Sequence, residues 1–323
     1  MKKKTNFSED DLIKNILRSV SLRTVLYFRS ELRVPWGIML AAREAAFFHV
    51  VTRGQCWLEV EGQQGFWRLQ AGDVMILPQG NAHSLRNAPH TLPTRLEDVL
   101  TKNPLKEGRL LCFGGQGPLT TLVCGGFDFS DWKINPLRLL LPIVLHIKGR
   151  KGQVVSSLKS LLTYVQEECD ANQPGEEIVL TRVSEVFFVK ALQSYLVSSK
   201  NEESELAALR DSQIGRLLSA IHDHPERAWT LKSLAKIAGM SRSALSQQFK
   251  TVVGESPQRY VTRCRLNRAA QFLEATDTKI VNIARRVGYG SEFSFSRAFK
   301  RALGTTPKGY RRETLNKKCQ LPD

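Results

Sequence analysis

The last hundred residues repeat one pattern twice, and this repeat limits the fold more than any other feature of the chain. At an offset of 50 residues, identical residues align in pairs: Phe249 with Phe299, Lys250 with Lys300, Gly254 with Gly304, Pro257 with Pro307, and Tyr260 with Tyr310. Upstream of these pairs the offset falls to 49, so the second copy has one extra residue near its turn. Such self-similarity indicates one supersecondary unit used twice.

The first copy reads as a helix, a tight turn and a second helix. Thr230 is placed to cap the first helix, and Gly239 permits the left-handed turn that ends it. Ser241 is placed to cap the second helix. Apolar residues at helical spacing predict the buried faces of both helices: Leu231, Leu234, Ala235 and Ala238 on the first, Leu245 and Phe249 on the second.

The second copy has the same order of signals. Asp277 or Thr278 is expected to cap its first helix, Gly288 to end that helix, and Ser291 to cap the next one. In both copies an alanine stands where two short helices must cross closely, which is the packing constraint of a helix-turn-helix. The expected buried residues of the second copy are Ile280, Ile283, Ala284, Val287, Phe295 and Phe299.

A long helix is predicted between the two copies. Ser256 followed by Pro257 forms a cap with proline at the first helical position, and the helix runs to about Ala275. Its length would be about 28 Å, close to the roughly 34 Å that separates successive major-groove faces of B-DNA. One chain could therefore present two recognition helices to one side of a duplex.

Four stretches of the second copy match one signature: residues 283–291 (IARRVGYGS), 295–300 (FSRAFK), Gly304 to Pro307, and Tyr310-Arg311. This signature closely resembles that of the AraC/XylS family of bacterial transcription regulators. The resemblance covers residues 214–312 and implies a DNA-binding domain of two helix-turn-helix units joined by a long helix, with double-stranded DNA as partner. RNA polymerase would be a further partner if the protein is an activator, and we expect an activator.

The family's base-reading positions are transferred to exposed residues of the two second helices. Arg297 could pair with guanine, Gln247 with adenine, and Glu292 with cytosine. Phe293 could touch a thymine methyl group or pack in the core, and the sequence leaves both open. The first helix has mostly serines, so we expect it to discriminate bases less sharply. The transferred set is Arg242, Ser243, Ser246, Gln247, Glu292, Phe293, Ser294 and Arg297.

Positive charge is concentrated in the same region. Residues 211–312 contain 19 Lys or Arg against seven Asp or Glu, a surplus of +12. This region therefore supplies most of the chain's net charge of +16. A basic module of this kind binds polyanions or is a solvated surface, and charge alone does not decide between them. If it binds DNA, its affinity should fall steeply with salt. The candidate phosphate contacts are Lys250, Arg259, Arg263, Arg268, Lys300, Arg301, Arg311 and Arg312.

The N-terminal half has a different pattern. Residues 45–87 alternate between apolar and polar positions, and tight turns separate the short runs, as in a small barrel or jelly roll. Gly72 to Asn87 fits G-x5-P-x-G-x2-H-x3-N, which resembles the second cupin motif, and residues 48–54 resemble a degraded first motif. The expected fold class is α+β: an N-terminal cupin-like β-barrel, a helical linker, and an all-α domain of two helix-turn-helix units.

The resemblance to cupins implies a small-molecule or oxidant signal in this barrel. The chain retains His49 and His83 but has Val51 and Arg53 where a metal-binding cupin would supply further ligands. Because two imidazoles rarely make a tight site, we expect no metal and no cofactor. The predicted sensor residues are His49, Trp57, His83, Cys112 and Cys124; for the two cysteines an inert buried thiol is the open alternative.

Two segments between these regions have helical periodicity, Val154 to Cys169 and Ile178 to Val197. Their apolar stripe could pack on the barrel or pair with a second chain, and the family resemblance favours a homodimer. A polar linker is expected at residues 198–204. The predicted domains are residues 1–150 (sensor), 151–210 (helical linker), 211–313 (DNA binding) and 314–323 (tail).

These features predict a sequence-specific transcription regulator and not an enzyme. Two alternatives remain: a cupin metalloenzyme with a DNA-binding tail, and an architectural protein that binds DNA without preference. Bound metal would indicate the first, and uniform weakening by Arg297→Ala would indicate the second. No apolar run is long enough for a bilayer, no secretion signal is expected, and six scattered cysteines favour a reducing cytoplasm.

Overall fold

The computed structural model describes residues 22–129, 134–149, 151–171, 173–198 and 212–319. These residues form two compact units, one dominated by β-strands and one entirely helical. The strand unit comprises the described residues within 20–130 and 142–204. The helical unit comprises the described residues within 131–141 and 205–323. Most of the predicted linker, residues 199–204, lies outside the described residues.

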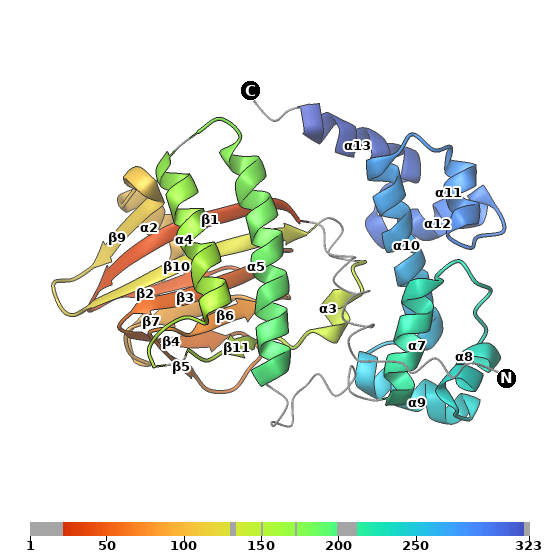
Figure 1. The fold of residues 1–323 in the computed structure, drawn as a ribbon, viewed down its shortest axis with the longest axis horizontal. Coiled ribbons are helices and arrows are strands. Elements are labelled where there is room, and N and C mark those ends of the chain that lie inside the picture. Colours follow the sequence, from red (N-terminus) through yellow and green to blue (C-terminus); the bar gives the residue numbers. More distant parts are fainter. Residues whose placement is uncertain (1–21, 130–133, 150, 172, 199–211, 320–323) are drawn as a thin grey trace. The chain divides into compact units, whose positions relative to one another are not determined.

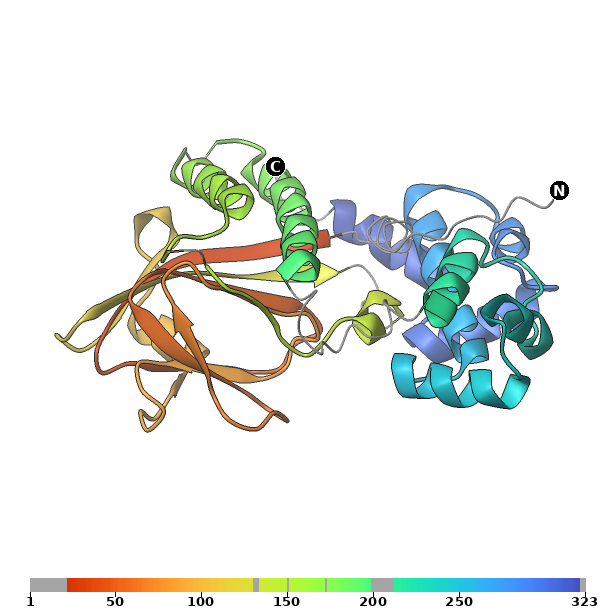
Figure 2. The same cartoon turned by 60° about the horizontal axis from the view of Figure 1, so that its bottom comes forward.

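The strand unit contains two separate sheets that face each other (Figure 2). One has six strands in the order β11-β6-β3-β10-β1-β9, and the other has five in the order β5-β4-β7-β2-β8. The pattern over residues 45–87 correctly predicted strands here. The described strands form two layers, however, and not the closed barrel that we expected. The strands are β1 (Leu22–Arg33), β2 (Gly37–Leu40), β3 (Ala46–Arg53), β4 (Gln55–Val60), β5 (Trp67–Gln70), β6 (Val74–Leu77), β7 (His83–Arg86), β8 (Thr94–Arg95), β9 (Leu110–Gly114), β10 (Leu119–Phe129) and β11 (Leu145–Ile147).

Alternation along each strand places apolar side chains between the two layers. On β4, Cys56, Leu58 and Val60 are almost fully buried, whereas the residues between them are partly exposed. They join a single hydrophobic cluster with side chains from the six-stranded sheet, including Leu32 and Met75. The short helices α2 (Leu96–Lys102), η1 (Glu107–Arg109) and α3 (Leu137–Leu140) lie in connections between strands.

Two long helices, α4 (Ser156–Ala171) and α5 (Glu176–Ser198), cover the outer face of the six-stranded sheet (Figure 1). Both helices were predicted from their periodicity. Phe187 and Phe188 on α5 pack on Phe127, with ring centroids 6.2 and 5.5 Å apart, and Phe187 also meets Phe48. The apolar stripe therefore packs on the sheet, which was one of the two open possibilities.

The helical unit shows the predicted duplication in its packing. In the first copy the ring of Tyr260 lies edge-on to Phe249 at 5.6 Å, and in the second Tyr310 lies edge-on to Phe299 at 5.5 Å. All four side chains are buried. The helices are α7 (Ser212–Asp223), α8 (Leu231–Ala238), α9 (Arg242–Val253), α10 (Pro257–Ala275), α11 (Ile280–Arg286), α12 (Glu292–Leu303) and α13 (Pro307–Cys319).

Four of the predicted N-caps are confirmed. The side chains of Thr230, Ser241, Ser256 and Ser291 each accept a hydrogen bond from the backbone N–H three residues later. The predicted cap of α11 by Asp277 or Thr278 is wrong, because that helix starts after Lys279, which makes no side-chain cap. The Thr278 hydroxyl instead accepts a hydrogen bond from Thr276, and its carbonyl accepts one from Arg311.

Candidate nucleic-acid interface and sensor cluster

The second helices of the two copies, α9 and α12, have the same sequence of buried and exposed positions over their first nine residues. Leu245 and Phe249 on α9 are fully buried, as are Phe295 and Phe299 on α12. The opposite faces point to solvent, so each helix has a free side along its N-terminal turns. Of the predicted base readers, Arg242, Ser243, Gln247, Glu292, Phe293, Ser294 and Arg297 are exposed, and Ser246 is partly exposed.

Phe293 decides one question that the sequence left open. Its side chain is 78% exposed on the first turn of α12, whereas Phe295 is completely buried. Phe293 is therefore not part of the core. Its exposed ring is therefore free to contact a partner that approaches the N-terminal turn of α12.

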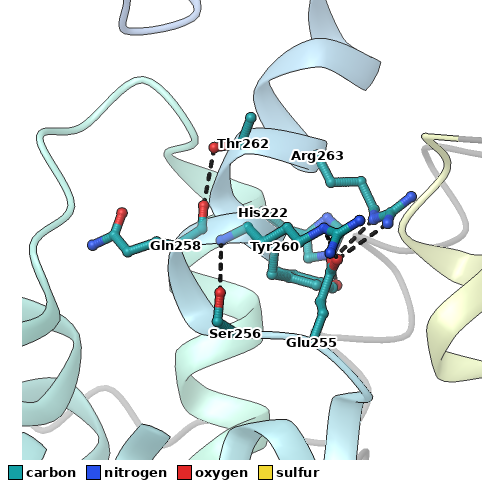
Figure 3. Close-up of polar contacts among 8 residues, drawn as sticks. His222, Glu255, Ser256, Gln258, Tyr260, Thr262 and Arg263 are labelled. Carbon is teal, nitrogen blue, oxygen red and sulfur yellow. Dashed lines mark hydrogen bonds and ion pairs between the residues drawn. The ribbon is translucent and has the colours of Figure 1, made fainter. Parts of the chain in front are cut away.

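The predicted phosphate contacts fall into two groups. Exposed cations stand on α9, α10, α12 and α13: Lys250, Arg259, Arg268, Lys300, Arg301 and Arg312. Arg263 and Arg311 are instead used inside the unit. Arg263 forms two hydrogen bonds with the buried Glu255, Nε to Oε1 at 2.9 Å and a terminal nitrogen to Oε2 at 3.1 Å (Figure 3). Arg311 donates to the carbonyl of Thr278 at 2.6 Å.

The Glu255–Arg263 pair belongs to a buried polar cluster that sequence reasoning missed (Figure 3). Glu255 is 8% exposed, and Tyr260 beside it is fully buried. The Tyr260 hydroxyl lies 2.8 Å from Nε2 of His222 on α7. Burial lowers the pKa of His222 to about 4, so its ring is neutral near pH 7. The cluster connects α7 to the start of α10. In the sequence, its one visible sign is the acidic residue Glu255 directly before the Ser256 cap.

In the strand unit, three predicted sensor residues form one buried chain of contacts. Nε2 of His49 lies 2.8 Å from Nε2 of His83, and Nδ1 of His49 lies 3.1 Å from the Cys124 sulfur. Nδ1 of His83 lies 2.8 Å from the carbonyl oxygen of Asn81. All three side chains are less than 5% exposed.

The direction of these hydrogen bonds follows from the Asn81 carbonyl, which can only accept. If both rings are neutral, Nδ1 of His83 donates to it, and Nε2 of His83 accepts from His49. Nδ1 of His49 then accepts from the Cys124 thiol. Burial lowers the pKa of His83 to about 4 and lowers that of His49 well below its usual range, while burial raises the pKa of Cys124. Each group is therefore in its uncharged form, as this arrangement requires.

This cluster does not fit the metal site of a metal-binding cupin. Every ring nitrogen of His49 and His83 already has a hydrogen-bond partner, so neither ring presents a free nitrogen. Asp73, the carboxylate of the second motif, accepts from His146 and from the backbone of Gly149 instead. Across the described parts of the chain, no group of three or more His, Cys, Asp or Glu side chains is arranged to hold a metal ion.

A small pocket lies beside the cluster, and His49 and Cys124 form its polar end. Its other walls are mostly apolar, with Phe28, Leu40, Phe47 and Leu96 among them. Gly125 and Gly126 border it without side chains. Arg43 and Glu97 also line the pocket; their charged groups are 3.6 Å apart and about half exposed, so they mark its solvent side.

Trp57 and Cys112 do not join this cluster. Trp57 lies on the outer face of β4, near Arg68 and Phe66, because it alternates with the buried Cys56 and Leu58. Cys112 on β9 pairs with Glu31 of β1, whereas Cys124 on β10 pairs with Phe28 of β1 from the other side. Positions three apart on one strand face opposite sides, and the two outer strands are about 10 Å apart. The sheet therefore separates the two sulfurs.

Four described cysteines, Cys56, Cys112, Cys124 and Cys264, are free thiols. Burial and the Asp73 carboxylate raise the pKa of Cys56 to about 12. None of the helices in the described ranges is both long and apolar enough to cross a membrane.

Comparison with known proteins identifies both halves. The model of the Cupin family matches residues 11–197, more than half of the chain, and that of the Helix-turn-helix domain family matches residues 234–313. An AraC-like transcription regulator of Streptomyces lividans is 31% identical over 285 residues, which cover 86% of this chain and 90% of that protein. The transcriptional regulator AlkR of Acinetobacter baylyi is 27% identical over 94% of this chain and all of that protein.

The RCS-specific transcriptional activator RclR of Escherichia coli is 29% identical over 82% of this chain and 83% of that protein. Among solved structures, the DNA-binding domain of AdpA in complex with a target DNA is 25% identical, with a TM-score of 0.32, and covers 33% of this chain and 96% of that one. The chain belongs to the AraC family of DNA-binding transcription regulators, with a cupin domain in its N-terminal half.

Proposed function

We propose that one chain binds two successive major-groove segments of a specific operator, α9 in one and α12 in the next. The observation that carries this proposal is the matched exposure of the two helices, each with a capped N-terminus and a free face directed away from its core. Recognition helices contact base edges with their N-terminal residues, and these are the residues left free here.

The side chains on α12 supply a more specific reading than those on α9. Arg297 and Glu292 can distinguish guanine and cytosine, and the exposed Phe293 offers an apolar surface to a thymine methyl group. On α9, Gln247 is suited to adenine, with Arg242, Ser243 and Ser246 beside it. The exposed cations on α9, α10, α12 and α13 would fix the register on the phosphate backbone without reading sequence.

We propose that the pocket beside His49 and Cys124 receives a small, mainly apolar effector, and that the strand unit acts as a sensor and not as an enzyme. The mostly apolar walls, with few polar groups among them, favour binding over chemistry. Oxidation at Cys124 is a weaker reading, because a buried neutral thiol is a poor nucleophile. The homodimer and the contact with RNA polymerase belong to the same proposal, as does activation, since the relative RclR is named as an activator.

The test starts with DNA fragments selected from a random pool by the full-length protein, with and without hydrogen peroxide. Footprinting on the best fragment should show two protected segments for each subunit, about one helical turn apart. Protection of one segment per subunit would contradict the proposal. Arg297→Ala should lower the binding free energy by about 1–3 kcal/mol and relax the base preference at one position only. In an architectural protein the same substitution would weaken binding to all DNA sequences alike.

A metal assay addresses the enzyme alternative. The full-length protein, purified without chelators, should contain no stoichiometric iron, manganese or zinc. Stoichiometric metal that is lost in both His49→Ala and His83→Ala would contradict the sensor proposal and support a cupin enzyme. The matched control is His146→Ala, because His146 lies outside the cluster and contacts Asp73.

A further inference from the structure

The extra residue of the second copy lies in its turn. One residue separates Gly239 from the Ser241 cap in the first copy, whereas Tyr289 and Gly290 separate Gly288 from the Ser291 cap in the second. The ring of Tyr289 is half-buried and lies edge-on to Phe295 of α12, with centroids 5.4 Å apart. The longer turn therefore carries an aromatic side chain that packs directly on the recognition helix.

Arg265 on α10 connects this turn to the loop that precedes the first copy. Its guanidinium carbon lies 5.8 Å from the centre of the Tyr289 ring. Its Nε donates to the carbonyl of Pro225 at 2.7 Å, and a terminal nitrogen donates to the carbonyl of Arg227 at 2.6 Å. A planar guanidinium can make both bonds while stacking on the ring, which an ammonium group cannot do.

The loop itself is held at two further points. The indole nitrogen of Trp229 donates to the carbonyl of His224 at 2.9 Å, and Gln258 at the start of α10 donates to the carbonyl of Trp229 at 3.1 Å. Trp229 is 9% exposed. The loop is thus fixed on α10 near both Gln258 and Arg265, two helical turns apart.

Gly288 brings the two backbones into contact. Its φ is +85°, and a Cβ atom built there would lie 2.3 Å from the carbonyl oxygen of Glu226 in the loop. Its counterpart Gly239 has a similar φ of +69°, but a Cβ there would meet only the Gln213 side chain, at 3.7 Å. Only the glycine of the second copy is therefore needed for a close approach as well as for a left-handed turn.

We propose that Arg265 and Gly288 are positioning residues that hold the two helix-turn-helix units at one separation and one rotation, so that the protein selects operators by half-site spacing. This inference rests on the proposed binding of two successive grooves. The loop before α8 belongs to the first unit and the turn before α12 to the second, and they meet at this junction. Neither residue reads a base.

The consequence can be measured with DNA. Inserting one base pair between the half-sites moves the second site by about 3.4 Å and turns it by about 35°. A fixed pair of recognition helices cannot follow this movement and loses contacts at one half-site. A loosened pair can follow it, with lower affinity for the original operator and a smaller penalty for the insertion.

The experiment uses the full chain and the operator selected from a random pool. Dissociation constants are measured for that operator and for a version with one base pair inserted between the footprinted segments. The wild type should lose about tenfold or more in affinity on the insertion, the cost of about one bidentate base contact. We define the insertion ratio as the dissociation constant for the inserted operator divided by that for the original operator. Arg265→Gln and Gly288→Ala should each reduce this ratio at least about threefold, because part of the lost base contact is regained.

Two matched variants separate positioning from other roles. Arg265→Lys keeps the charge but loses the two-carbonyl fork, so it should behave like Arg265→Gln. Gly239→Ala imposes the same left-handed strain without the clash, so its ratio should equal that of the wild type. Circular dichroism and urea unfolding show whether each variant folds, and Arg265→Gln decides the matter if Gly288→Ala does not fold.

Equal weakening on both operators, with the wild-type ratio retained in Arg265→Gln, would overturn the junction proposal, because it would indicate a loss of stability or of a phosphate contact. A wild-type ratio in Arg265→Lys alone would also overturn it, because a point charge would then suffice. The underlying proposal fails differently: the wild type itself would protect only one groove segment for each subunit. A wild type that protects two segments but tolerates the insertion would overturn the junction proposal alone.

Discussion

Phe293 is the side chain whose role can be isolated most cleanly. Because it is 78% exposed at the N-terminus of α12, its proposed partner is a thymine methyl group. Replacing that thymine by deoxyuridine removes only the methyl group and should weaken wild-type binding about fourfold, the value of about 0.8 kcal/mol for one buried carbon. Titration of each thymine position in the selected operator would locate the effect.

The matched variant is Phe293→Ala. It should bind the thymine and deoxyuridine operators equally, because the apolar contact is gone from both. Phe295→Ala is not a substitute, since Phe295 is buried and its loss would lower the free energy of unfolding by about 3–5 kcal/mol. An undiminished methyl effect in Phe293→Ala would assign thymine recognition to another residue.

Buried histidines make the stability of the protein depend on pH. Burial lowers the pKa of His83 and that of His222 from 6.5 to about 4. Between these two pH values each histidine is protonated in the unfolded chain but stays neutral in the folded chain. The stabilising effect is therefore complete above pH 6.5 and is lost as the pH falls toward 4. Each group should cost about 2 kcal/mol between pH 7 and pH 5.

His222 offers a direct test in the helical unit. The groups around it are the Tyr260 hydroxyl and, beyond that, Cys264, Glu255 and Arg263. Hydrogen exchange of α7 and α10, measured in the full chain at pH 7 and pH 5, should show acid loosening in the wild type and much less in His222→Gln. The same acid loosening in the variant would place the titrating group elsewhere.

At the scale of the elements, the caps give the sharpest prediction. The Ser291 hydroxyl accepts from the Ser294 N–H at 3.2 Å, so Ser291→Ala should lower the free energy of unfolding by about 1 kcal/mol. The control is Asp277→Ala, because Asp277 was expected to cap α11 and does not. Urea unfolding would compare them; equal losses would mean that the Ser291 cap contributes nothing specific.

The caps also show how far the sequence determines the elements. Serine or threonine followed by a periodic apolar run correctly predicted the starts of α8, α9, α10 and α12, because the capping hydrogen bond is local. The start of α11 was missed because Thr278 is bound by Thr276 and by Arg311, and Arg311 is 33 residues away. Contacts over such distances do not appear in a local pattern.

Contacts between residues far apart in the sequence also explain which features of the sensor cluster and of the nucleic-acid interface were missed. The motif around His83 correctly indicated a cupin, but the hydrogen bond from His49 and the position of Cys124 depend on strand register. Trp57 was expected to line the pocket, yet the alternation of β4 turns it outward. Arg263 was expected to contact phosphate, and only the fold brings it to Glu255.

For the whole molecule, the exposed cations predict how binding depends on salt. Six of the candidate phosphate contacts have exposed side chains, although Arg259 among them also forms an ion pair with the buried Glu255 at 3.5 Å. Six released counterions correspond to a slope of about −5 in a plot of log affinity against log salt. Lys300→Gln should reduce this slope by about one without changing base preference, because an exposed lysine neutralises one phosphate.

Arg263→Gln is the matched comparison, since it removes the same charge from a residue already paired with the buried Glu255. It should leave the slope unchanged and lower the free energy of unfolding instead, because the buried Glu255 loses its two hydrogen bonds from Arg263 and keeps a longer ion pair with Arg259, at 3.5 Å. Binding titrations from 50 to 200 mM salt, with urea unfolding of the same samples, would separate the two effects. A slope reduced equally by both variants would mean that Arg263 turns toward DNA when the protein binds it, and the division between internal and phosphate-binding arginines would then be wrong.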